Sequence, residues 1–235
     1  MKIMYIECNM GAAGDMLTAA LAEVTGDVKG CESTLNSLGI PGVSYSLAPS
    51  VKCGITGTHA EVSVNGEVED EHMHEHEHHH HDHEHEHVHD HEHEHEHHHH
   101  HSSLHDIEHI IGDLNVSDKV KSDAIAVYKL IADAESKAHG RDISQIHFHE
   151  VGTMDAVADV VGFCTLMEKI APEKVVVSPV HVGYGEVRCA HGILPVPAPA
   201  TAHILEGVPV YGGEVKSELC TPTGAALLKH FAAEF

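Results

Sequence analysis

The densest chemistry in this sequence lies between His72 and His101, where nineteen of thirty residues are histidine and the others are nine acids, Met73 and Val88. Imidazole is neutral at pH 7 and binds nickel, copper, zinc and cobalt well, and carboxylates between the imidazoles raise the local concentration of cations. With two apolar residues, the run has too little to bury against the entropy cost of ordering. We therefore predict a disordered segment that captures a transition metal and that is also a solvated acidic linker.

All nineteen histidines of this run are predicted metal ligands. Lowering the pH through about 6.5 would protonate them and release bound cations. They are His72, His74, His76, His78, His79, His80, His81, His83, His85, His87, His89, His91, His93, His95, His97, His98, His99, His100 and His101.

A second candidate site is the sequence HFHE at residues 147–150, with Asp155 and Asp159 following it. Alternate side chains of an extended strand share a face, so His147 and His149 could coordinate one ion together. Asp155 and Asp159 are one turn apart on the helix that we expect next. The cluster, which includes Glu150, predicts an octahedral or tetragonal metal site. The alternative is that the acids only offset the helix macrodipole.

Two glycine-containing segments are candidates for binding an anion. Residues 9–15 (NMGAAGD) join a predicted strand to a predicted helix, and such a loop offers free backbone N–H groups. This loop lacks the Lys and the glycine spacing of a Walker A loop or a dinucleotide fingerprint. A plain tight turn is therefore the alternative, and Asp15 could instead cap the helix. The segment TPTG at 221–224 is a capped helix start that could bind phosphate or only begin a helix.

The stretch from His181 to Thr201 combines glycines with the proline run PVPAP at 195–199. The prolines predict a rigid, extended loop. Within this stretch Cys189 and His191 could share a metal or a substrate thiol.

Composition excludes several classes of protein. The formal net charge is −24, and the thirteen acids from Glu67 to Glu96 supply about half of it, so neither nucleic acid nor anionic lipid is an expected partner. The six cysteines are scattered without a C-x-x-C pair, which fits neither a zinc ribbon nor a disulfide framework. We find no signal-peptide pattern and no apolar run long enough to span a bilayer, and we expect a cytoplasmic protein.

Hydrophobic periodicity predicts strands alternating with helices, and so an α/β fold, with mixed α+β as the variant. We expect an N-terminal segment at 1–66, a His/acid-rich insertion at 67–104, and a segment at 105–235 that packs against the first. The expected strands are 2–8, 43–47, 56–64, 143–149, 174–182 and 208–211. The expected helices are 16–24, 32–38, one around 107–114, one between the cap Ser117 and Gly140, then 155–170, 199–205 and 224–231.

Four blocks of this sequence resemble, in order, the motifs of the nickel insertion proteins of the LarC type. The blocks are MKIMYIECNMGAAGDML, HFHEVGTMDAVADVVG, HGILPVPAPATAHIL and ELCTPTGAAL, and the resemblance covers residues 1–235. It implies a lyase-class enzyme that inserts Ni²⁺ into pyridinium-3,5-bisthiocarboxylate mononucleotide. The product is the nickel-pincer nucleotide cofactor of lactate racemase-type enzymes, and the reaction depends on CTP and a divalent cation.

The resemblance also implies roles for the candidate residues. A ring C–H proton must leave as nickel arrives, so His147, His149, Glu150 or Asp155 would hold nickel or take the proton. The substrate phosphate would be received around Gly11, Gly14 and Asp15 or around Thr221, Thr223 and Gly224. The histidine run would gather Ni²⁺ and pass it inward.

Members of this family continue beyond the stretch that corresponds to residue 235, into a part associated with CTP and metal binding. We therefore expect an N-terminal component whose CTP-binding part is supplied by a C-terminal partner or by a longer frameshift product, and a homo-oligomer also stays open. A nickel metallochaperone or store, based on the histidine run itself, is the alternative function.

Overall fold

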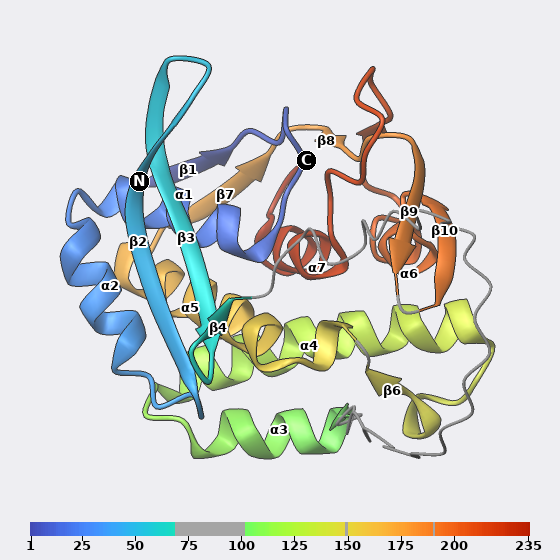
Figure 1. Ribbon diagram of the computed structural model, residues 1–235, viewed down its shortest axis with the longest axis horizontal. Helices are drawn as coiled ribbons and strands as arrows, with labels where there is room; N and C mark the ends of the chain where they lie inside the picture. Colours follow the sequence, from blue (N-terminus) through green and yellow to red (C-terminus); the bar gives the residue numbers. More distant parts are fainter. Residues whose placement is uncertain (69–101, 149, 190) are drawn as a thin grey trace, which may run out of the picture.

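The computed structural model describes residues 1–68, 102–148, 150–189 and 191–235 (Figure 1). The predicted ligands from His72 to His101, as well as His149, lie outside these ranges. In chain order the elements are β1 (Ile3–Ile6), α1 (Gly14–Thr25), α2 (Val28–Asn36), β2 (Val43–Lys52), β3 (Ile55–Val64), β4 (Glu67–Val68), β5 (Ser102–Ser103), α3 (Leu104–Asp113), α4 (Asp118–His139), η1 (Ile143–Gln145), β6 (His147–Phe148), η2 (Glu150–Gly152), α5 (Met154–Ile170), β7 (Lys174–Val177), β8 (Val180–His181), β9 (Gly185–Cys189), β10 (Gly192–Val196), α6 (Pro199–Ile204), β11 (Val210–Tyr211) and α7 (Pro222–Phe231).

A short parallel sheet joins the two ends of the sequence. Strand β1 pairs with β7 in the register Ile3↔Lys174, and the Val177 N–H donates to the Glu234 carbonyl at 2.9 Å on the other side of β7. Side chains alternate along a strand, so the apolar residues of β1 divide between two faces. Met4 packs against the core, whereas Ile3 and Tyr5 face solvent.

The helix α5 is the centre of the core. Its buried residues run around most of its circumference, as expected of a helix covered on all sides. Helices α1, α4 and α7 pack against it, and the long β2–β3 hairpin lies over α1 and α5 (Figure 1). The segments before and after residues 69–101 therefore share one hydrophobic core.

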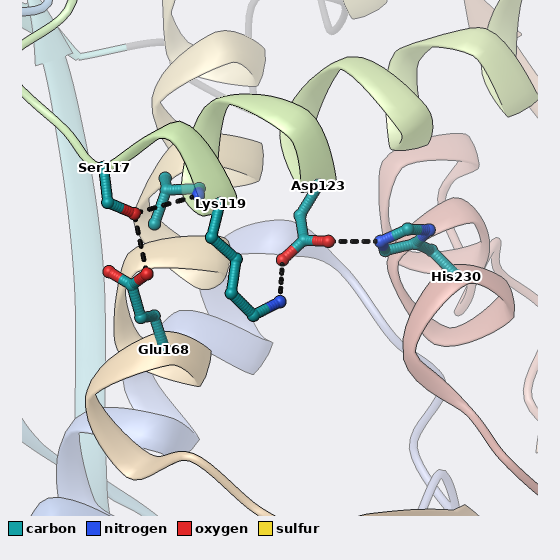
Figure 2. Close-up of polar contacts among 6 residues, drawn as sticks. Ser117, Lys119, Asp123, Glu168 and His230 are labelled. Carbon is teal, nitrogen blue, oxygen red and sulfur yellow. Dashed lines mark hydrogen bonds and ion pairs between the residues drawn. The ribbon is translucent and has the colours of Figure 1, made fainter.

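Local capping accounts for the ends of several helices. The Ser117 hydroxyl accepts a hydrogen bond from the Val120 N–H at 3.1 Å (Figure 2). Helix α4 ends at Gly140, whose φ of 62° is left-handed. Helix α3 begins with a capping box, in which the Ser103 hydroxyl and the Asp106 carboxylate each bond the other residue's backbone N–H. Strand β5, which precedes this cap, pairs with β6.

The mixed α/β class is confirmed, and so are most helices and strands, with boundaries shifted by a few residues. Helix α2 begins earlier than expected, at Val28, because the Asp27 side chain caps it through the Gly30 N–H at 2.9 Å. The hairpin strands β2 and β3 run beyond the predicted 43–47 and 56–64 to a tight turn at residues 53 and 54.

Two predictions about the second half of the sequence are wrong, and one predicted β-rich run is divided. Residues 143–149 are not one strand, because the Asp142 carboxylate accepts from the Ser144 N–H at 3.0 Å and starts the 3₁₀ turn η1. Residues 174–182 are two strands, separated at Ser178 and Pro179. The predicted rigid loop of 181–201 contains the antiparallel hairpin β9–β10, in which Gly192 pairs with Cys189.

None of the helices that the structure describes has both the length and the apolar character needed to cross a bilayer.

Two buried tyrosines permit a matched test of this core. The Tyr45 hydroxyl donates a hydrogen bond of 2.7 Å to the Ala158 carbonyl, whereas no described residue offers a partner to the Tyr128 hydroxyl. We expect Tyr45→Phe to lower the free energy of unfolding by about 1 kcal/mol, since a buried hydrogen bond is lost. We expect Tyr128→Phe to leave it unchanged or raise it, since no bond is lost. Urea unfolding of the two variants measures the difference, and equal losses would contradict the assignment.

Candidate functional site

The two predicted anion-binding segments lie against each other. The Ala12 N–H donates to the Leu219 carbonyl at 2.9 Å, and the Thr221 N–H donates to the Ala12 carbonyl at 3.0 Å. These bonds form a parallel bridge between Ala12 and Cys220. The loop after β1 and the start of α7, which are far apart in sequence, therefore lie directly against each other.

Glycine permits this close approach. Gly11 has a φ of 83°, and a Cβ placed on it would overlap the Leu219 carbonyl. A Cβ on Gly14 would lie 2.5 Å from the Cβ of Asp159, so the start of α1 touches the second turn of α5. The loop thus brings the starts of α1 and α7 and the first turns of α5 together (Figure 1).

The starts of α1 and α7 differ in how their backbone N–H groups are satisfied. Thr221 caps α7 by accepting from the Gly224 N–H at 3.1 Å, and its hydroxyl also meets the Thr223 hydroxyl at 2.9 Å. The predicted cap Asp15 is wrong: Ala13 occupies the N-cap of α1 without a side-chain hydrogen bond, and Asp15 lies in the first turn. The N–H groups of an uncapped first turn are the natural donors to an anion.

Carboxylates line the neighbouring start of α5. Asp155 and Asp159 are half-buried, one turn apart. Both charges reach the buried Tyr128 phenol, whose pKa is raised first by desolvation and then by these two carboxylates. The pKa of Tyr45 is also raised well above its usual value, by burial and by Asp159. Both phenols therefore stay neutral, and the carboxylates are the charged groups of this region.

His147 lies on the face of β6 opposite to Phe148. Phe148 is buried against Tyr128 with ring centroids 6.0 Å apart, while His147 is exposed and pairs in register with Ser103. His147 also contributes to the lowered pKa of Asp106, after the larger effects of the hydrogen bonds from Ser103 and of His105. His147 is therefore placed beside the start of α3.

The structure leaves the predicted pairing of His147 with His149 untested. His149 lies outside the described residues, and the same holds for the side chain of Glu150, whose backbone begins η2. Within the described ranges, no group of three or more His, Cys, Asp and Glu side chains is arranged to hold a metal ion.

Sequence reasoning did not single out His181, which holds the glycine loop in place. Its ring is buried, with Nδ1 2.7 Å from the Asn9 carbonyl oxygen and Nε2 3.1 Å from the Gly212 carbonyl oxygen. The Tyr211 ring stacks on it at 4.6 Å and 12°. Both ring nitrogens of His181 therefore face carbonyl oxygens of other loops. A histidine at the end of a β-rich run gave no signal of this role.

Two buried thiols lie behind the loop. Burial raises the pKa of Cys8 to about 11 and that of Cys220 to about 12, so both are protonated at neutral pH. A thiolate is the form that binds metal, and these cysteines are therefore packing residues of the loop in the state described here.

Comparison with known proteins supplies the context for this site. The family model described as "Nickel insertion protein" matches residues 4–235. The chain is 40% identical over 240 residues to a protein of Clostridium kluyveri and 43% identical over 239 residues to one of Clostridium acetobutylicum. It is 38% identical over 236 residues to one of Desulfitobacterium hafniense. Each is named pyridinium-3,5-bisthiocarboxylic acid mononucleotide nickel insertion protein.

These alignments cover 100% of this chain but 54%, 57% and 51% of the three relatives. The chain thus spans about half the length of the curated relatives it matches. No solved structure matches it.

The contact at Gly11 can be tested against a matched glycine. Gly11 and Gly26 both have left-handed φ values, 83° and 72°, but nothing lies within 4 Å of a Cβ placed on Gly26. We expect Gly26→Ala to lower the free energy of unfolding by about 1 kcal/mol, the conformational cost alone. Gly11→Ala should cost at least about 2–3 kcal/mol, because the methyl group also displaces the 219–221 segment. Urea unfolding compares them, and equal costs would show that the contact with Leu219 can relax.

Proposed function

This chain belongs to the nickel insertion protein family, and on that premise we propose that it forms the substrate-binding portion of an enzyme that inserts Ni²⁺ into pyridinium-3,5-bisthiocarboxylate mononucleotide. The substrate is the one printed in the names of its relatives. The product would be the nickel-pincer nucleotide cofactor of lactate racemase-type enzymes. The observation that carries the proposal is the convergence of the 9–15 loop with the starts of α7 and α5.

The phosphate of the mononucleotide would bind at the start of α1. Backbone N–H groups and the helix dipole favour a phosphate there, and α1 lacks a side-chain cap. Gly11 and Gly14 keep the loop compact, and the Thr221–Gly224 segment supports it from the other side through Ala12. Asp15, Thr221 and Thr223 would border this phosphate site.

The phosphate would bind to positively polarised N–H groups, whereas the nickel ion and the departing proton need negatively charged or basic groups. Insertion forms two sulfur–nickel bonds and one carbon–nickel bond, and the ring carbon loses its proton as the last of these forms. We assign the acceptance of this proton to the group His147, His149, Glu150 and Asp155. Asp155 is supported by its place on α5, one turn before the Asp159 that touches Gly14. A carboxylate held there would both attract the dication and take the proton.

CTP and its divalent cation would bind to polypeptide that corresponds to the other half of the relatives, supplied by a C-terminal partner or a longer product. The exposed apolar face of β1, formed by Ile3 and Tyr5, supports a contact with such polypeptide. Assembly of several copies is the other arrangement consistent with this face. The six free thiols fit a reaction in the reducing cytoplasm.

A nickel store is the second candidate function, and the nineteen histidines between His72 and His101 favour it. In the insertase, the same run would supply Ni²⁺ to the site.

Replacement of Asp155 tests the assigned proton acceptor. We expect Asp155→Asn to lower the rate of nickel insertion by about 10²–10⁴-fold, the usual contribution of a general base. The assay contains CTP, Mg²⁺, Ni²⁺, the mononucleotide and a C-terminal partner, and the absorbance of the nickel cofactor is the readout. Asp133→Asn, at an exposed position of α4, is the control and should retain the full rate. An unaltered rate in Asp155→Asn would remove this residue from the mechanism.

Deletion of residues 72–101 separates the insertase from the store. For an insertase we expect the shortened chain to reach the full rate at saturating nickel, while it needs more nickel to do so. Equilibrium dialysis should show fewer nickel ions bound per shortened chain, because the nineteen histidines of this run are gone. A chain that binds many nickel ions and yields no cofactor with any partner would instead be a store.

A further inference from the structure

Two histidines from different elements meet on a surface that the proposed reaction does not use. His139 lies in the last turn of α4, and His191 lies in the turn that joins β9 to β10. Their ring centroids are 4.9 Å apart and the rings are tilted by 45°. The side chain of His139 is 37% exposed, so an ion in solvent can reach the pair.

The separation of the rings suits a shared ion. Imidazole nitrogens bind a transition-metal dication at about 2.0–2.1 Å, so two rings at about 90–110° around one ion have centroids about 4.5–5.2 Å apart. The observed 4.9 Å falls within this interval. Rings bound to one ion can rotate about the metal–nitrogen bonds, which leaves the tilt of 45° compatible with coordination.

A carboxylate lies close to one ring nitrogen of His139. The Glu135 Oε2 atom lies 3.4 Å from the His139 Nε2 atom, one helical turn away. A carboxylate at one ring nitrogen favours a proton on that nitrogen and leaves the lone pair of the other for a metal. The carboxylate also supplies negative charge next to the ion.

Both histidines are held by the ends of regular elements. His139 precedes the left-handed Gly140, whose N–H donates to the Lys137 carbonyl at 3.3 Å and stops the helix. The pair Cys189↔Gly192 closes the hairpin on either side of His191. Side chains next to regular elements are positioned more precisely than side chains on free loops.

We propose that His139 and His191 bind one transition-metal dication of the Ni²⁺ class through their imidazole nitrogens, with Glu135 orienting His139. The site differs from the histidine run and from the site around α1, α5 and α7. Water completes the coordination, so the ion is held in an exchangeable way. That the ion is the nickel consumed in insertion rests on the proposed function, whereas binding of Ni²⁺ itself does not.

The test follows each histidine separately in the full chain. Diethylpyrocarbonate acylates free imidazole nitrogens, and peptide mapping by mass spectrometry gives the rate for each histidine with and without Ni²⁺. At a nickel concentration ten times the dissociation constant, we expect the rates at His139 and His191 to fall together by about tenfold. Equal concentrations of Mg²⁺, which prefers oxygen ligands, should leave both rates unchanged.

His203 provides the matched control. Its side chain is 34% exposed and its Nδ1 lies 3.1 Å from the Glu206 Oε1, so it shares the exposure and the carboxylate of His139. We expect nickel to change the acylation rate of His203 by less than about twofold, since a single imidazole with one carboxylate binds the ion weakly. His191→Asn should abolish the protection of His139, and His203→Asn should leave it intact.

Three results would overturn the proposal: no protection by Ni²⁺, protection of one histidine without the other, or equal protection of His203. The assay contains no mononucleotide and no CTP. Failure here therefore leaves the proposed insertion untouched, and failure of insertion leaves this binding result untouched.

Discussion

The contact between Ala12 and the 219–221 segment organises the rest of the structure. Ala12 is fully buried and uses both its N–H and its carbonyl in bonds to Leu219 and Thr221. A buried backbone group without a partner costs about as much as a lost hydrogen bond, so this bridge fixes the path of both segments. Glycines on either side let the backbones approach. As a consequence, the start of α1 is held next to the starts of α7 and α5.

The N-terminal end of α5 explains why carboxylates occur so near the core. Asp155 occupies the first turn of α5, where the unpaired N–H groups and the macrodipole stabilise negative charge, and Asp159 follows one turn later. Farther along α5, the buried positions are apolar. The two tyrosines that approach these carboxylates stay protonated, because burial and the negative charge act in the same direction on their pKa values. Between Asp159 and Glu168, α5 therefore carries no charged residue.

Local signals in the sequence were sufficient to predict helices and strands. They were insufficient to predict which of these elements contact each other. Ser117, Gly140 and Thr221 cap their helices as predicted, because a cap depends on residues three or four positions away. The pairing of β1 with β7 and the bridge at Ala12 depend on residues far apart in sequence, and periodicity carries no information about them.

The same distinction holds within the candidate site. The sequence identified both glycine segments but described them as alternatives, and it passed over His181, whose partners Asn9 and Gly212 lie in other loops. Asp15 follows the pattern of a cap, yet the N-cap of α1 lies two residues earlier, at Ala13. Which residue caps a helix depends on where the preceding loop is anchored, and here the anchor is the contact of Ala12 with Leu219.

Net charge sets the remaining condition for the proposed function. An anionic mononucleotide would approach a chain with a formal charge of −24, which repels it at long range. At physiological ionic strength this repulsion is screened beyond about 8 Å, so the local field at the start of α1 decides whether the phosphate binds. The acids that repel the anion attract the dication that must join it. The start of α1 offers N–H donors and the neighbouring start of α5 offers carboxylates. Such an arrangement can hold both reactants, because the anion would contact the N–H groups while the dication would contact the carboxylates.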